Sequence, residues 1–79
     1  MWRLRYSLEA AGYIADNWHL IDDLITAIKA LAETKDAISP EGVQRDLGLY
    51  IWEIAHHRVY YAPVPEKNNI NILVLKPLE

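Results

Sequence analysis

One arginine in the last third of the chain carries the clearest chemistry. Arg58 follows two histidines, and its guanidinium offers a fixed fork of N–H donors that suits phosphate oxygens. It could equally pair with Glu53 across a predicted hairpin. An imidazole titrates near neutrality, so His57 is a candidate acid or base beside Arg58, or an ordinary turn residue like His56. Adjacent histidines are poor spacing for metal ligands, and no metal site is predicted.

The faces of the predicted strands decide which groups can join this arginine. If Arg58 and Tyr60 lie on an open sheet face, then Arg3 and Arg5 of the first strand could share it. Three of the four arginines would then concentrate in a protein whose net charge is −3. Tyr60 and Tyr61 could stack on bases or pack in a core, and packing is the default for tyrosines in strands.

Composition limits the remaining classes. Seventy-nine residues, 52% of them hydrophobic, make one packed domain, 1–79. The absence of cysteine excludes a thiolate nucleophile and favours the cytoplasm. No stretch approaches the roughly twenty apolar residues of a membrane helix, and no signal peptide or cofactor motif is present. The acidic balance disfavours extensive contact with nucleic acid, so such contact would need a local patch.

Hydrophobic periodicity predicts the first half of the fold. Alternation over 2–6 indicates a strand, and Ser7 is placed to cap a helix over 8–17. A second apolar stripe, with Trp18 as an anchor of the connection, predicts an antiparallel helix over 20–34.

The second half is predicted to be a three-stranded meander. Residues 35–48 are expected to form a loop, with a short helical turn at 41–46. Strands are expected over 49–54, 58–62 and 70–75, joined by a tight turn at 55–57 and by a turn beginning at Pro63. The class is α+β with the order βααβββ. The helical hairpin packs on one face of a mainly antiparallel sheet, which the first strand also joins.

Three segments and this order resemble the RelE/ParE toxin superfamily of type II toxin–antitoxin systems. The segment 2–10 is similar to the family's opening strand and helix start, and 48–54 resembles its second strand. Arg58-Val59-Tyr60-Tyr61 is similar to the Arg and Tyr of its third strand. The resemblance implies that Arg58 stabilises the scissile phosphate of RNA, with His57, Tyr60 or Tyr61 assisting proton transfer.

The resemblance also shows departures from the RNA-cleaving branch. Tyr50, Trp52 and Glu53 stand where that branch carries basic residues, and no segment matches its C-terminal helix. Lys76 is the nearby candidate for a substitute. The catalytic set of a ribosome-dependent endoribonuclease is therefore incomplete, and whether the protein is an enzyme stays open.

Three functions follow from the resemblance. The first is a toxin that inhibits translation by cleaving mRNA on the ribosome, with Arg3, Arg5 and Lys76 contacting RNA or a partner. The second is a non-enzymatic inhibitor of DNA gyrase, and the third is a non-toxic interaction module. Each implies a cognate antitoxin, which would cover the open sheet face or the helical hairpin. An unpaired outer strand could also support a homodimer.

Overall fold

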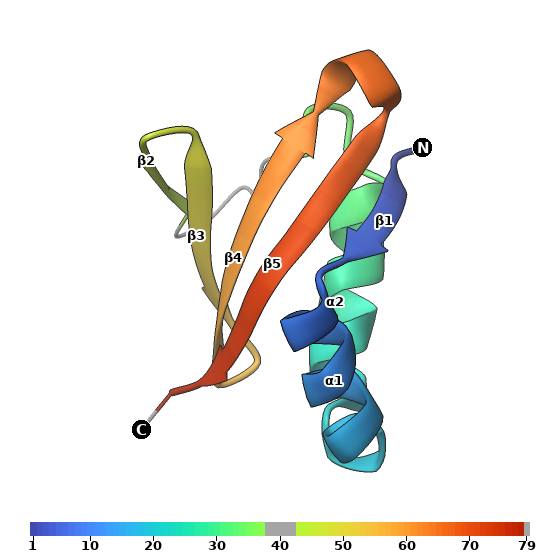
Figure 1. Cartoon of the computed structure of the whole chain (residues 1–79), viewed down its shortest axis with the longest axis vertical. Coiled ribbons are helices and arrows are strands. Elements are labelled where there is room, and N and C mark those ends of the chain that lie inside the picture. Colours follow the sequence, from blue (N-terminus) through green and yellow to red (C-terminus); the bar gives the residue numbers. More distant parts are fainter. Residues whose placement is uncertain (38–42, 79) are drawn as a thin grey trace.

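The computed structural model describes residues 1–37 and 43–78 and confirms the α+β class. A five-stranded sheet has the strand order β1-β5-β4-β3-β2, in which β1 and β5 are parallel and the other pairs antiparallel (Figure 1). The strands are β1 (Arg3–Tyr6), β2 (Val43–Asp46), β3 (Leu49–Ile54), β4 (His57–Val64) and β5 (Asn69–Pro77). The helices are α1 (Leu8–Asn17) and α2 (Asp22–Ala32), with 3₁₀ turns η1 (Trp18–Leu20) and η2 (Pro65–Lys67).

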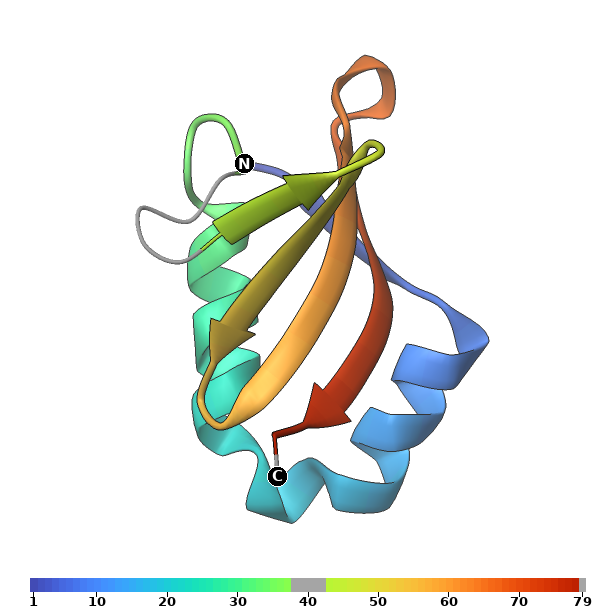
Figure 2. The same cartoon turned by 90° about the vertical axis from the view of Figure 1, so that its left-hand side faces the viewer.

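Both helices cover one face of the sheet, and the core lies between them. Its largest fully buried side chains are Tyr61, Leu24, Ile28, Ile70, Ile72 and Val59. Figure 2 looks onto the opposite face, which neither α1 nor α2 covers. We call this surface the open face. Because side chains alternate along a strand, each residue of β3 and β4 next to a core residue points to the open face.

Ser7 fixes the junction between β1 and α1. Its Oγ accepts a hydrogen bond from the Ala10 N–H at 3.0 Å, which caps the helix, and donates one to the Leu73 carbonyl at 2.6 Å. The pairing of β4 with β5 shifts at this point, because Tyr60 lies opposite Val74 whereas Tyr61 lies opposite Ile72. Leu73 is thus the extra residue of a β-bulge, and the helix cap and the bulge support each other.

Four expectations about the elements were wrong in detail. Residues 43–46 form strand β2 instead of a helical turn, and 41–42 lie outside the described residues. Pro63 continues β4 opposite Ile70 and does not begin the turn. The second helix is shorter than the predicted 20–34, since Leu20 belongs to η1 and α2 spans Asp22–Ala32. Trp18 is no core anchor, because 63% of it is exposed.

The predicted bounds of α1, 8–17, are correct, but its first apolar residue does not pack in the core. Ala10 is buried, whereas Leu8 is 94% exposed. No helix among residues 1–37 and 43–78 is long and apolar enough to cross a membrane.

Candidate functional site

Two rows of side chains cross the open face of the sheet. Strand pairing places Glu53 opposite Arg58, and Arg58 opposite Lys76. The neighbouring row is made by Gln44, Ile51, Tyr60 and Val74, contributed by β2, β3, β4 and β5 in turn. The first row therefore carries one negative and two positive side chains, with Arg58 in the middle.

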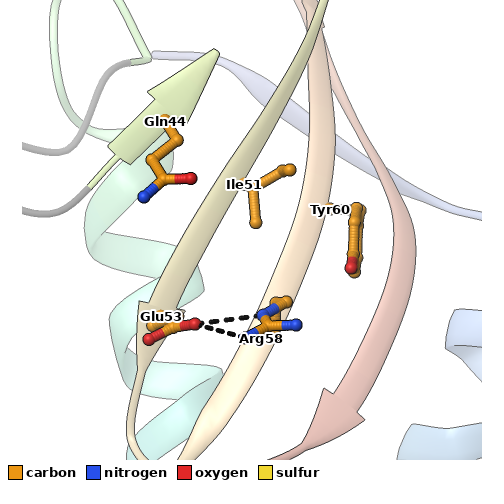
Figure 3. Close-up of a pocket in the computed structure, with 5 residues that line it drawn as sticks. All are labelled: Gln44, Ile51, Glu53, Arg58 and Tyr60. Carbon is orange, nitrogen blue, oxygen red and sulfur yellow. Dashed lines mark hydrogen bonds and ion pairs between the residues drawn. The ribbon is translucent and has the colours of Figure 1, made fainter. Parts of the chain in front are cut away.

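Arg58 and Glu53 form an exposed ion pair. The Nε and Nη2 atoms of Arg58 both donate to Oε2 of Glu53, at 3.0 and 2.7 Å, while the two side chains are 43% and 51% exposed (Figure 3). The hydrogen bond to Glu53 and the negative charge of that residue, together with a hydrogen bond that the Tyr60 hydroxyl accepts, raise the pKa of Arg58 above its ordinary value. Arg58 is therefore positively charged at every physiological pH, and it is presented outward.

Hollows lie on either side of the guanidinium. One, of about 560 Å³, is lined by Gln44, Ile51, Glu53, Arg58 and Tyr60 (Figure 3). The other, of about 350 Å³, is lined by Arg58, Lys76, Pro77 and Leu78. Pockets that bind small ligands commonly hold about 300–1,000 Å³. Arg58 thus stands between two spaces of ligand size, one beside a carboxylate and one beside an ammonium group.

The structure does not bring His57 and Tyr61 to this site. Both point to the face that the helices cover, where Tyr61 is fully buried between Tyr50 and Trp52. The His57 ring is held at both nitrogens, by the Ala55 carbonyl and the Tyr13 hydroxyl, each at 2.7 Å. Neither side chain reaches a ligand on the open face in this arrangement.

Arg3 and Arg5 do share the open face with Arg58, but they lie near its far end. Arg5 pairs with Asn71 of β5, which pairs with Ala62, four residues along β4 from Arg58. At about 3.3 Å per residue, that separation is about 13 Å along the strand, with two strand spacings across the sheet in addition. The arginines form an extended basic surface and do not converge on one small ligand.

Sequence reasoning did not include Gln44 in the site. Gln44 lies on β2, the strand that was expected to be a helical turn, and its amide faces the larger hollow (Figure 3). The available signal was Leu47-Gly48 before the alternating run of β3. These two residues have φ of 51° and 86° and form a hairpin turn that returns β2 to β3. Within the described residues no cluster of three or more histidine or acidic side chains could hold a metal ion.

The comparisons with known proteins identify the fold. No protein-family model and no curated protein matches the sequence. Among solved structures, the chain is similar to the isolated RelE toxin of E. coli, with a TM-score of 0.58 over 100% of this chain and 86% of that chain. The two sequences are 11% identical. At that identity the likeness carries the fold and not the activity, so the conclusion is that this chain has a RelE-like fold.

Proposed function

We propose that the protein is the toxin of a type II toxin–antitoxin module and inhibits translation by cleaving mRNA on the ribosome. The observation that carries the proposal is Arg58, a permanently charged guanidinium on the open face of a RelE-like fold, between two ligand-sized hollows. A cognate antitoxin is the expected partner, because a free toxin of this kind would stop growth of its own cell.

The reaction assigned to the site is a transfer within RNA. The ribose 2′-oxygen attacks the adjacent phosphorus, the bond from phosphorus to the 5′-oxygen breaks, and a 2′,3′-cyclic phosphate remains. The 2′-hydroxyl proton leaves to solvent or a basic group, and the departing 5′-oxygen takes up one proton. Arg58 stabilises the charge that develops on the phosphate oxygens, with Lys76 beside it. Tyr60 is the neighbouring hydroxyl on the same face that can donate the proton.

Substitution of Arg58 tests this assignment. We expect Arg58→Ala to lower ribosome-dependent cleavage on the order of 10²–10³-fold and to abolish growth inhibition, since a transition-state donor is lost. Arg45→Ala is the matched control. Arg45 is an exposed arginine that lies over the Tyr50 ring, 5.8 Å from its centroid, and Tyr50 packs against the core. Undiminished growth inhibition by a folded Arg58→Ala variant would refute the catalytic role.

Inhibition of DNA gyrase without catalysis is the second candidate, and the Glu53 pairing favours it. A neutralised arginine and an overall charge of −3 suit a protein partner better than a polyanion. Induced expression separates the two functions. A ribonuclease stops protein synthesis within minutes, whereas a gyrase inhibitor first induces the DNA-damage response. Growth that continues without any antitoxin would instead support a non-toxic interaction module.

A further inference from the structure

The ion pair on the open face uses only part of each partner. Both hydrogen bonds that Arg58 donates to Glu53 end on Oε2, so Oε1 has no partner among residues 1–37 and 43–78. The remaining guanidinium nitrogen, Nη1, points away from Glu53 (Figure 3). An exposed ion pair of this kind contributes little to the free energy of unfolding. Stability therefore does not explain why the pair lies between two hollows.

The two hollows differ in what they can bind. The side of Arg58 with Lys76 carries two cationic groups and suits a phosphate. The larger side offers the Tyr60 ring and Ile51 as a surface on which a planar group can lie. The Glu53 carboxylate, which can accept hydrogen bonds, and the Gln44 amide also line this side (Figure 3). A phosphate alone fits that side poorly, because the Glu53 carboxylate repels it.

A nucleotide with an amino-bearing base satisfies both sides at once. A carboxylate accepts hydrogen bonds from an exocyclic amino group, such as N4 of cytosine. Uracil instead presents the O4 carbonyl at that position, and its N3–H lies between two carbonyl oxygens that the carboxylate repels. Bases stack on tyrosine whatever their identity, so stacking on Tyr60 supplies affinity and leaves the choice of base to Glu53.

We propose that Glu53 is a specificity-determining residue, which selects single-stranded RNA with an exocyclic amino group on the base over Tyr60 and rejects uridine there. This inference rests on the proposed function for its ligand class, but it concerns binding and not cleavage. Arg58 has two tasks in it, since it holds Glu53 through Nε and Nη2 and contacts phosphate through Nη1.

Binding of two short oligonucleotides that differ only in base tests the inference. The probes are fluorescent oligocytidine and oligouridine with 2′-O-methyl riboses, which cannot be cleaved, and the measurement is fluorescence anisotropy with the full chain. We expect the wild type to bind oligocytidine about tenfold more tightly than oligouridine, because the bond is made to a charged acceptor. Glu53→Gln should abolish that preference and bind oligouridine about fivefold more tightly, since the repulsion of phosphate disappears.

Controls separate this inference from the function on which it rests. Glu53→Gln keeps an oxygen that can accept from Arg58, so it changes charge with little change in geometry, and Arg45→Ala should bind like the wild type. Equal binding of both probes by the wild type, or a preference that survives Glu53→Gln, would overturn the base selection and leave the ribonuclease proposal standing. A preference for cytidine without cleavage on ribosomes would reject the ribonuclease alone. Binding of neither probe would overturn the selection outright.

Discussion

The two faces of β4 use neighbouring residues for opposite purposes. His57, Val59 and Tyr61 point under the helices and hold the fold together, whereas Arg58 and Tyr60 point outward, where a ligand can reach them. The tyrosine pair shows the difference most sharply, because Tyr61 is fully buried and Tyr60 lines a hollow. Residue type alone therefore says little about role in this strand, and position in the two-residue period decides it.

Truncation of the two tyrosines should separate these roles by the largest margin. We expect Tyr61→Ala to lower the free energy of unfolding by about 3–5 kcal/mol, because it leaves a cavity between Tyr50 and Trp52. That loss is a large part of the roughly 5–15 kcal/mol that holds a domain together. Tyr60→Ala should leave the unfolding transition in urea nearly unchanged and impair RNA binding. Equal loss of stability in both variants would contradict the division between faces.

The hydrogen bond between Tyr13 and His57 should give a smaller effect of the same kind. The Ala55 carbonyl can only accept, so Nδ1 of His57 is the donor there, and in the neutral ring Nε2 accepts from the Tyr13 hydroxyl. We expect Tyr13→Phe to lower the free energy of unfolding by about 1–2 kcal/mol, because Nε2 loses its donor. Urea denaturation measures the loss.

A double-mutant cycle supplies the control for this pair. If the hydrogen bond is the cause, Tyr13→Phe should cost little in a His57→Phe background. Growth inhibition by the folded Tyr13→Phe variant should match the wild type, since neither residue faces the ligand. Loss of toxicity without loss of stability would instead return His57 to the site.

The sequence predicted the elements that bury a face and missed the strand that does not. Alternation over 49–54 and 58–62 predicted β3 and β4 because every second residue there is apolar. Strand β2 reads Val-Gln-Arg-Asp and is exposed after Val43, so it has no alternating apolar pattern. The strand is held by backbone pairing with β3, and the sequence indicates that pairing only through the turn at Leu47-Gly48. The prediction that a turn begins at Pro63 failed because the pairing of β4 with β5 continues through this residue, and pairing is not visible in the sequence.

The site could be predicted only as far as strand alternation reaches. Arg3, Arg5, Arg58 and Tyr60 were expected to share the open face, and the strand pairing places them there. Alternation also places His57 and Arg58 on opposite faces of β4. The residue types suggested the contrary, because a histidine next to an arginine in the sequence is typical of a shared site. The bulge at Leu73 and the approach of Gln44 depend on pairing between strands, which a one-dimensional pattern does not contain.

The smallest expected effect is confined to alkaline pH and tests whether β1 has the same two-sided character as β4. Tyr6 lies on the helix-covered side of β1, where a hollow of about 290 Å³ is lined by Tyr6, Ala11, Ile14, Ala15 and Ile25. Burial raises the pKa of Tyr6 above its ordinary value of 10.0, because the phenolate loses hydration there. In the unfolded chain the phenol ionises at the lower pH, near 10.

The sign of the pH dependence follows from that order. Below pH 10 Tyr6 is neutral in both states, and its contribution to stability is complete. As the pH rises toward the folded pKa, the unfolded state loses its proton first, so the free energy of unfolding falls. We expect Tyr6→Phe to remove this part of the alkaline loss, so that the melting temperature decreases less between pH 9 and 11 than in the wild type. Equal decreases of the melting temperature in the two proteins would show that the Tyr6 phenol is hydrated, and the sheltered side of β1 would then not extend to Tyr6.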